Sequence, residues 1–346
     1  MKNKRISILD IGNHLKISKS TVSFIINGKA KEKRISDEVA QRVKSYVAEI
    51  GYKPNSLAKS LRSGKSYIIG LLVEDISNPF FAGIARLMED KINKSGYRIL
   101  YASTDNDVIK TREILRMMRD RHVDGYIISP PEGIEPEIND LLEDHLPLVV
   151  FDRYLPGVDA DYVVVDNKSS AYNATLHLLD EGNRKVLFIT YHARESQMRD
   201  RMEGYTEAMV AHNLKPVIAE IEYGHDQQHI AGSLRELLKK HTDTDAILFA
   251  TNQIGVSGLQ VLQELGKKLP EDLAILSFDD HIVYSLYSPT ITAVAQPIDE
   301  IAGNVITCIL ARLNKTQASQ KEFHTITLKN ELIIRDSTRR NVIPCR

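Results

Sequence analysis

From residue 66 onward the chain alternates short apolar runs with longer amphipathic stretches, and this alternation constrains the fold more than any other feature. The apolar runs have the length of strands and cover residues 67–73, 98–102, 125–128, 148–151, 185–189, 246–249 and 274–277. Near-continuous apolar strands separated by helices are typical of parallel sheets covered on both faces. Because the 281 residues from residue 66 to the end exceed what one such core holds, we expect two lobes.

Polar side chains follow several of these runs at the point where the predicted strand ends. Ser129 follows the third run, Asp152 follows the fourth, and Asn252 and Asp279 follow the last two. In doubly wound sheets ligands bind outside the carboxyl ends of the strands, so these side chains are expected to converge on a cleft between the lobes. Each of them could instead be a helix cap or part of an ion pair in a loop.

The charge of the chain is divided unevenly along its length. Residues 1–65 contain 15 Lys and Arg against 5 Asp and Glu, a net charge of +10, whereas the remaining residues contain 30 against 41, a net charge of −11. A basic head on an acidic body is expected where the head binds a polyanion, because each neutralised phosphate releases counterions. The alternative is a solubilising charged tail, but this segment is rich in helix signals rather than low in complexity.

The basic head contains the pattern of three short helices. Apolar residues at helical spacing predict helices over residues 8–15, 18–26 and 36–50, with Ser18 and Ser36 as amino-terminal caps and Gly51 as a left-handed stop. In the second helix this leaves four donor-rich side chains on an exposed face that suits a groove: Lys19, Ser20, Thr21 and Ser23. The spacing alone also fits a small helical hairpin at the surface.

A fourth helical segment follows at residues 55–63, before Gly64. Asn55 can cap it and Leu57, Ala58 and Leu61 supply apolar positions. A helix of fewer than about a dozen residues is marginal by itself in water. We therefore expect this segment to become ordered only when it is paired or docked.

These motifs together resemble the headpiece of the lactose-repressor and galactose-repressor family of bacterial transcription regulators. The resemblance rests on Thr21-Val22-Ser23 with Ile26-Asn27, on Gly51-Tyr52 with Pro54-Asn55, and on Ala58 with Leu61, and it extends over nearly the whole chain. It implies that the second helix lies in the major groove of DNA. It also implies that the hinge helices of two subunits pair in the minor groove, where a leucine kinks the duplex.

The resemblance assigns DNA-binding roles to residues of the head. Lys19 and Ser20 would read bases, Thr21 and Ser23 would hold phosphates, and Leu61 would be the wedge. The full expected set is Ser18, Lys19, Ser20, Thr21, Ser23, Phe24, Asn27, Tyr52, Asn55, Ala58 and Leu61. Phe24 departs from the pattern, because many members carry arginine there; its ring would either pack into the core or touch a thymine methyl group.

For the body, the resemblance adds Arg201 and Gln296 to the residues at the strand ends. The expected effector-binding set is Ser129, Asp152, Arg201, Asn252, Asp279 and Gln296. Carboxylates, amides and a planar guanidinium suit a sugar or a sugar acid, and Arg153 leaves room for a ligand carboxylate or phosphate. An aromatic platform under the sugar ring would be Tyr223 or His225.

The resemblance also implies that the chain crosses between the two lobes three times. We expect a helix-turn-helix headpiece at residues 1–53 and a hinge at 54–65. A first lobe would comprise residues 66–165 plus 296–322, and a second lobe residues 166–295 plus 323–346. The expected fold class is therefore α/β, an all-α headpiece followed by a two-lobed, doubly wound core like that of type I periplasmic binding proteins.

Other chemistries are not supported by the sequence. Residues 63–66 resemble the end of a phosphate-binding loop, but position 59 is Lys rather than Gly. His225 and His229 could share a helix face, yet no third metal ligand is evident. The two cysteines are too few for a disulfide framework and agree with a reducing cytosol, and we see no signal segment or membrane span. We expect no cofactor, no metal and no enzymatic activity.

The sequence therefore predicts a dimeric, ligand-controlled transcription regulator in the cytoplasm. We expect a repressor that leaves a palindromic operator in double-stranded DNA when a small carbohydrate or sugar acid binds. A sugar-binding protein of a transport system would share the lobes but has no use for a basic helical head, and a sugar-converting enzyme would need a nucleophile or cofactor loop. Within the family, dependence on a corepressor or action as an activator remain alternatives.

Overall fold

The computed structural model describes residues 6–52, 64–192, 195–224, 227–314 and 322–339. The chain divides into two compact units, Met1–Gly64 and Lys65–Arg346. The first is the headpiece and the second is the body.

The headpiece is built from three helices around a small shared core. They are α1 (Ile8–Leu15), α2 (Lys19–Ile26) and α3 (Asp37–Glu49), close to the predicted ranges. The centre of the core consists of Ile11, Val22, Ile25, Ala40 and Val43. The turn between α1 and α2 is tight at Gly12, where a Cβ atom would lie 2.7 Å from the carbonyl oxygen of Ile17. Only glycine allows the two helices to cross at this distance.

Serine caps fix where these helices begin. The hydroxyl oxygen of Ser18 accepts from the backbone N–H of Thr21 at 3.1 Å, and that of Ser36 accepts from Val39 at 3.4 Å. Gly51 follows α3 with a φ of +58°. The predicted caps and the predicted stop are therefore confirmed.

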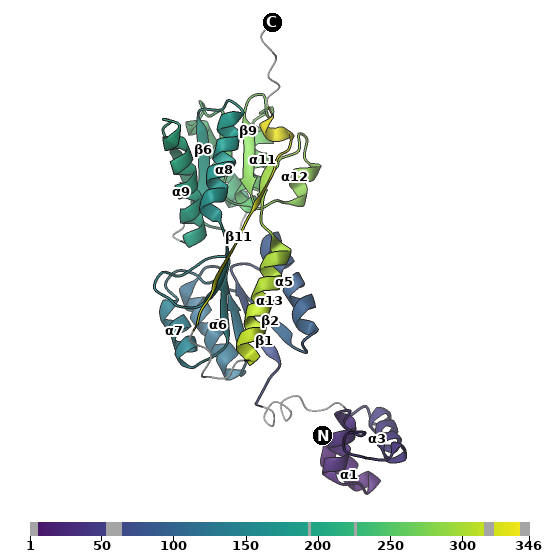
Figure 1. Ribbon diagram of the computed structural model, residues 1–346. Coiled ribbons are helices and arrows are strands. Elements are labelled where there is room, and N and C mark those ends of the chain that lie inside the picture. The colour runs from purple at the N-terminus through teal and green to yellow at the C-terminus, as the bar shows by residue number, and fades with distance from the viewer. Residues whose placement is uncertain (1–5, 53–63, 193–194, 225–226, 315–321, 340–346) are drawn as a thin grey trace. The chain divides into compact units, whose positions relative to one another are not determined.

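The first lobe of the body contains a six-stranded sheet in which every neighbouring pair is parallel. Its strands, in spatial order, are β11 (Thr325–Leu328), β5 (Asp161–Val165), β4 (Leu148–Phe151), β3 (Gly125–Ile128), β1 (Ile68–Val73) and β2 (Arg98–Ser103). One face packs on α5 (Pro79–Asn93) and α13 (Ile298–Asn314), and the other on α6 (Val108–Asp120) and α7 (Glu135–Glu143). Figure 1 shows these helices around the sheet.

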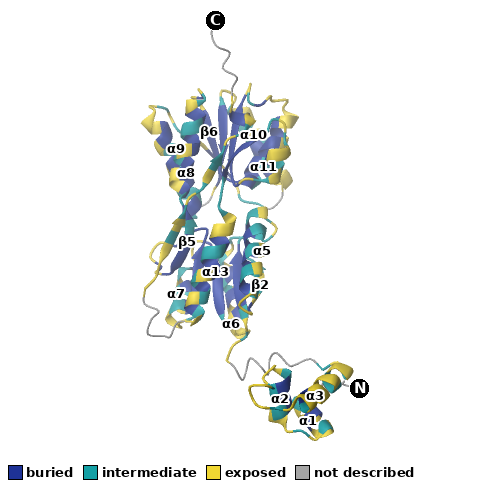
Figure 2. Ribbon diagram, turned by 45° about the vertical axis from the view of Figure 1, so that its right-hand side comes forward, coloured by how far each residue is buried: buried dark blue, intermediate teal, exposed yellow. Residues whose placement is uncertain are grey.

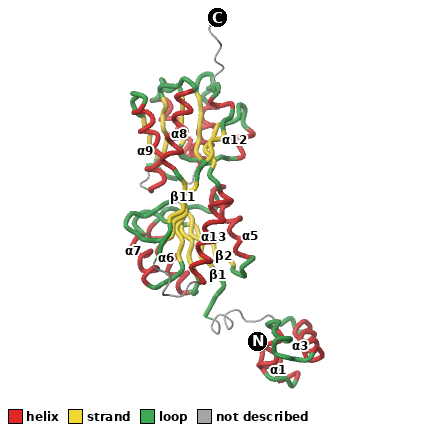
Figure 3. Tube along the Cα trace, viewed as in Figure 1, coloured by secondary structure: helices red, strands yellow, loops and turns green. Residues whose placement is uncertain are grey.

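The second lobe repeats this plan with one antiparallel edge strand. Its strands, in spatial order, are β12 (Glu331–Ile333), β10 (Thr292–Ala295), β9 (Ala274–Phe278), β8 (Ala246–Phe249), β6 (Val186–Tyr191) and β7 (Val217–Ile221). One face packs on α8 (Asn167–Asp180) and α9 (Ser196–Ala211), and the other on α10 (Gln227–Lys240), α11 (Asn252–Glu264) and α12 (Ile282–Leu286). The central strands β6, β8 and β9 are buried, and the helices keep exposed outer faces (Figure 2). Figure 3 shows the helices on both sides of the strands. The predicted fold class is confirmed.

The chain passes between the lobes three times, after β5, after β10 and after β11. The predicted position of the third crossing is wrong. Residues 323–346 were assigned to the second lobe, whereas β11 pairs with β5 in the first sheet, with Thr325 opposite Tyr162. The alternating Thr-Ile-Thr-Leu pattern of β11 identifies a strand but not the sheet that it joins. The crossing lies between β11 and β12.

Candidate functional site

The start of α2 presents polar side chains to solvent. Ser18, Lys19 and Ser20 are exposed and Thr21 is half-buried. The three hydroxyl groups lie together, because the Oγ atom of Ser18 is 2.9 Å from that of Ser20 and 2.8 Å from Oγ1 of Thr21. This end of the helix therefore offers one long cation and a cluster of short donors.

Ser23 does not lie on that exposed face, contrary to the prediction. The residue is 9% exposed, and the side-chain amide of Asn27 donates to its carbonyl oxygen at 2.7 Å and to its hydroxyl at 3.3 Å. The side chain of Asn27, the C-cap residue of α2, therefore folds back over this turn. Phe24 is half-buried, with the Nζ atom of Lys33 5.6 Å from the centre of its ring.

The other predicted DNA contacts lie toward the end of the headpiece. Asn27 is exposed and Tyr52 packs on the headpiece core. Asn55, Ala58 and Leu61 lie outside the described residues.

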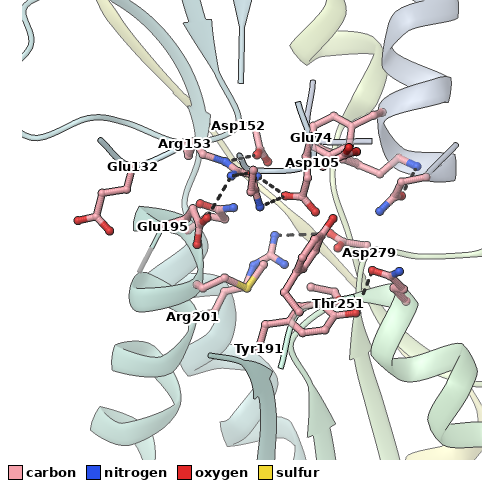
Figure 4. A pocket seen from close by; sticks show the side chains of 18 of the residues that line it. Glu74, Asp105, Glu132, Asp152, Arg153, Tyr191, Glu195, Arg201, Thr251 and Asp279 are labelled. Carbon is pink, nitrogen blue, oxygen red and sulfur yellow. Dashed lines mark hydrogen bonds and ion pairs between the residues drawn. The ribbon is translucent and has the colours of Figure 1, made fainter. Parts of the chain in front are cut away.

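The body contains a cavity of about 400 Å³ at the carboxyl ends of the strands, lined by residues from both lobes. The first lobe contributes mainly acidic and amide side chains, and the second contributes acidic, amide and tyrosine side chains and Arg201. Figure 4 shows ten of the lining residues: Glu74, Asp105, Glu132, Asp152, Arg153, Tyr191, Glu195, Arg201, Thr251 and Asp279.

Arg153 is the centre of the polar network on the first-lobe side. Its guanidinium donates to Asp152 at 3.0 Å, to Glu74 at 2.8 Å and to Asn106 at 2.8 Å, and Glu195 from the second lobe lies 3.9 Å away. Burial alone would lower the pKa of this group, but the three surrounding carboxylates raise it, so it remains a cation. Burial raises the pKa of the Asp152 carboxyl, against the opposing effect of the neighbouring arginines.

Arg201 has a similar position in the second lobe. It is 2% exposed, donates to Asn167 at 2.8 Å and to the carbonyl oxygen of Ala250 at 2.6 Å, and stacks over Phe278 at 4.3 Å. One of its amino groups lies 3.5 Å from the carboxylate of Asp279. This arginine is held rigidly, with one edge toward the cavity (Figure 4).

Gln296 connects this network to the second crossing of the chain. Its amide nitrogen donates to Asp279 at 2.6 Å, while its amide oxygen is buried and has no hydrogen-bond partner among the described residues. A buried acceptor without a partner is costly, so a donor on a bound molecule would be stabilising there.

The structure brings four of the six predicted effector residues into the wall of one cavity: Asp152, Arg201, Asp279 and Gln296. Ser129 is fully buried behind the wall and donates to Asp152 at 3.1 Å. Asn252 is buried at the start of α11, and its two neighbours, Thr251 and Gln253, line the cavity instead. Ser129 is therefore placed to support a lining residue rather than to touch a ligand.

Several lining residues were not predicted from the sequence. Glu74 directly follows the first apolar run, so the strand-end rule that selected Asp152 could have found it. Glu195 and Gln197 precede or begin α9, for which no sequence signal pointed to the site. Tyr223 was one of two candidates for an aromatic platform. It lines the cavity beside Tyr191, with the ring centres 5.3 Å apart, whereas His225 lies outside the described residues.

Within the described part of the chain, neither a membrane-spanning helix nor a metal-binding cluster is present. Among its helices, none combines the length and the apolar character needed to cross a membrane. Within the same residues, no group of three or more His, Cys, Asp or Glu side chains is placed to hold a metal ion.

Comparison with known families matches both parts of the chain. Residues 7–55 match the model "Bacterial regulatory proteins, lacI family", and residues 175–338 match the model "Periplasmic binding protein-like domain". The chain is similar to the solved structure "transcriptional regulator CelR-cellobiose complex", with a TM-score of 0.69 and 24% identity. The match covers 96% of this chain and 100% of the CelR chain. It is also similar to the structure of a LacI family regulator from Enterococcus faecium with bound ribose, with a TM-score of 0.69 and 25% identity. That match covers 78% of this chain and 98% of the other.

Full-length relatives agree with these matches. The chain is 29% identical to a ribose operon repressor of Halalkalibacterium halodurans over 96% of its own length and 97% of that protein. It is 30% identical to the HTH-type transcriptional regulator PtxS of Pseudomonas plecoglossicida over 96% of both chains, and to KdgR of Bacillus subtilis over 96% of its own length and 97% of that protein. These relatives are named as transcriptional regulators and not as enzymes. The chain belongs to the lacI family of bacterial regulatory proteins and is a DNA-binding transcriptional regulator.

Proposed function

We propose that this regulator is a repressor that binds a palindromic operator as a homodimer and leaves it when a small carbohydrate binds in the cavity. The observation that carries the proposal is a cavity whose polar groups come from both lobes, in a chain whose headpiece presents an exposed, basic helix end. Relatives include a ribose operon repressor, and similar structures hold ribose and cellobiose. Its site of action is the chromosome, and therefore the bacterial cytoplasm.

In this proposal the start of α2 reads the operator from the major groove. Lys19 and Ser20 contact base edges and Thr21 holds a phosphate, while a hinge at residues 54–65 places Leu61 in the minor groove. Exposure of Ser18, Lys19 and Ser20 supports this assignment, and the burial of Ser23 removes it from the set of direct contacts. Two copies related by a twofold axis would read the two half-sites.

The ligand controls DNA binding by favouring one relative placement of the lobes. Tyr154, after β4, donates through its backbone N–H to Ser196 at 2.9 Å and through its hydroxyl to Asp200 at 3.2 Å, so the lobes already touch beside the cavity. A ligand that contacts both walls changes the balance between such placements. To weaken operator binding a thousandfold, it must favour the released state by about 4 kcal/mol per dimer.

The proposal can be tested by binding the purified protein to fragments of its own genome, with and without a mixed panel of sugars, and sequencing the retained DNA. We expect a palindromic site that is lost in the presence of one ligand. A site that is retained only when a ligand is present would instead identify a corepressor-dependent regulator. Failure to enrich any site in either condition would contradict sequence reading by the headpiece.

The role of the cavity can be separated from DNA binding by Asp279→Ala. Asp279 is paired with Arg201 and Gln296 in the wall and lies in the body rather than in the headpiece. We expect operator affinity within about twofold of the parent and loss of the ligand response. Asp243→Ala, which removes an exposed carboxylate paired with Lys185, is the control. A normal ligand response in Asp279→Ala would rule out its assigned role.

A further inference from the structure

The lining of the cavity is strongly acidic. It contains six carboxylates, namely Glu74, Asp105, Glu132, Asp152, Glu195 and Asp279, against the two guanidinium groups of Arg153 and Arg201. The formal charge of the lining is −4 with His192 neutral and −3 when Asp152 is protonated. Lys110, which is not in the lining, pairs with Asp105, and the balance stays negative when its charge is included. A site for a sugar carboxylate or phosphate is expected to have the opposite balance.

Both arginines are already paired with carboxylates of the protein. Arg153 is surrounded by Asp152, Glu74 and Glu195, and Arg201 lies beside Asp279. Figure 4 shows the guanidinium of Arg153 between these acidic side chains. An anionic ligand would have to displace one of these carboxylates or be buried beside it, and either change is unfavourable at low effective dielectric.

The cavity wall also offers hydrogen-bond acceptors to a ligand. The buried amide oxygen of Gln296 has no partner in the part of the chain that the structure describes. The hydroxyl of Tyr191 donates to Gln253 at 2.9 Å. Burial raises the pKa of the Tyr223 phenol, and the negative charge of Glu74 raises it further. Donors on a ligand are therefore favoured at the amide oxygen of Gln296 and beside the carboxylates; hydroxyl and ammonium groups supply them, and ionised carboxylate and phosphate groups do not.

We propose that the effector is a hydroxyl-rich sugar that carries no carboxylate or phosphate, and that an amino-substituted sugar binds better than its neutral counterpart. This inference rests on the proposed function and narrows it, because the sequence alone predicts a sugar or a sugar acid. The excess negative charge attracts an ammonium group, and the unpartnered acceptor favours any ligand donor.

The inference is tested by calorimetric titration of the full-length protein with matched sugars that differ only in charge. Suitable sets are glucose, glucosamine and glucuronate; galactose, galactosamine and galacturonate; and ribose with ribose 5-phosphate, extended to disaccharides. We expect each acid or phosphate to bind about tenfold or more weakly than its neutral counterpart, a difference of about 1.4 kcal/mol. The amine should bind more tightly than the neutral sugar, and an amine that binds equally or more weakly would contradict the role of the excess negative charge.

An acid or phosphate that binds more tightly than its neutral counterpart would overturn the inference, even if it releases the operator as the proposed function requires. Absence of binding by every sugar in all charge classes would also overturn it. The selection of genomic DNA fragments would then still test, independently, whether the protein binds an operator.

A charge variant provides a second readout. Glu132 stands apart from the other carboxylates at the edge of the cavity and is not a partner of Arg153 (Figure 4). Glu132→Gln should reduce the ratio of amine affinity to neutral-sugar affinity about threefold, because one attracting charge is removed. Glu143→Gln makes the same change on an exposed residue of α7 outside the cavity wall. Equal ratios in the two variants would contradict the electrostatic explanation.

Discussion

Arg153 illustrates how single residues set both the stability and the chemistry of the body. Its charge is buried at 2% exposure and is balanced by carboxylates that are also largely buried. We expect Arg153→Met to lower the free energy of unfolding by about 3–5 kcal/mol, because the acidic partners lose their counter-charge. Urea denaturation measures this. Arg86→Met, at an exposed surface pair, should change stability by no more than about 0.5 kcal/mol. Similar losses in the two variants would contradict the assignment.

His177 gives the second lobe a predictable pH dependence. Its Nε2 atom lies 2.8 Å from the hydroxyl of Thr338, and burial lowers the pKa of its ring below the ordinary value of 6.5. Because the pKa of this ring is lower in the folded protein, the unfolded chain binds a proton at His177 more readily than the folded one. The stability that the neutral, buried ring contributes is therefore present above pH 6.5 and is lost as the pH falls below that value. We expect His177→Gln to flatten the decrease in stability between about pH 7.5 and 5.5. His229→Gln, at an exposed helical position, is the control for denaturation at each pH and should leave the decrease unchanged.

For single residues, the sequence predicted the site correctly where a rule about neighbouring positions in the chain applies. Asp152 and Asp279 could be selected because they end buried strands, and the same rule extends to Glu74. The pairing of Glu74 with Arg153 could not be foreseen, since it joins residues far apart in sequence across the sheet. The burial of Ser23 was missed because helical periodicity places a residue on a flank and does not reveal a side chain that folds over it.

At the level of elements, the contact between α8 and α9 depends on one glycine. A Cβ atom on Gly204 would lie 2.0 Å from the carbonyl oxygen of Lys168, whereas a Cβ on Gly232 of α10 would meet nothing within 4 Å. Gly204→Ala should therefore destabilise the body by about 1–3 kcal/mol through overpacking. Gly232→Ala should be neutral or stabilise it by up to about 1 kcal/mol.

The same pair of variants tests the link between helix packing and the cavity. Arg201 lies one turn before Gly204 on α9, so a displaced helix also displaces this guanidinium. We expect Gly204→Ala to weaken sugar binding in calorimetric titrations and Gly232→Ala to leave it unchanged. Loss of stability without any change in ligand affinity would show that α9 moves without carrying Arg201.

The sequence predicted β1, β2, β3, β4, β6, β8 and β9, but not the interior strands β5 and β10 or the edge strands β7, β11 and β12. Buried strands such as β8 are continuous apolar runs, whereas β7 and β11 alternate buried or half-buried residues with exposed ones. Their positions depend on which sheet has a free edge, and that is a property of the assembled lobes. For this reason the third crossing was placed too early.

At the level of the whole molecule, the proposed mechanism requires two copies acting on one DNA duplex. Leu61→Ala should weaken operator binding by much more than nonspecific binding. An intercalated leucine contributes binding free energy only where the DNA is kinked at a defined base step. Electrophoretic mobility shifts with operator and scrambled duplexes at one fixed salt concentration measure both affinities. Equal losses on the two duplexes would exclude the wedge role.

The three crossings also determine when the first lobe can finish folding during synthesis on the ribosome. The first sheet is translated early, yet α13 covers one of its faces and β11 forms one of its edges, and both come from the last part of the chain. Until that part emerges, the apolar surface of the first lobe remains exposed to other chains, a condition that promotes aggregation. A premature stop codon after β10 would therefore remove a wall of the amino-terminal lobe, and such a truncated polypeptide should be a substrate for chaperones and proteases rather than a smaller regulator.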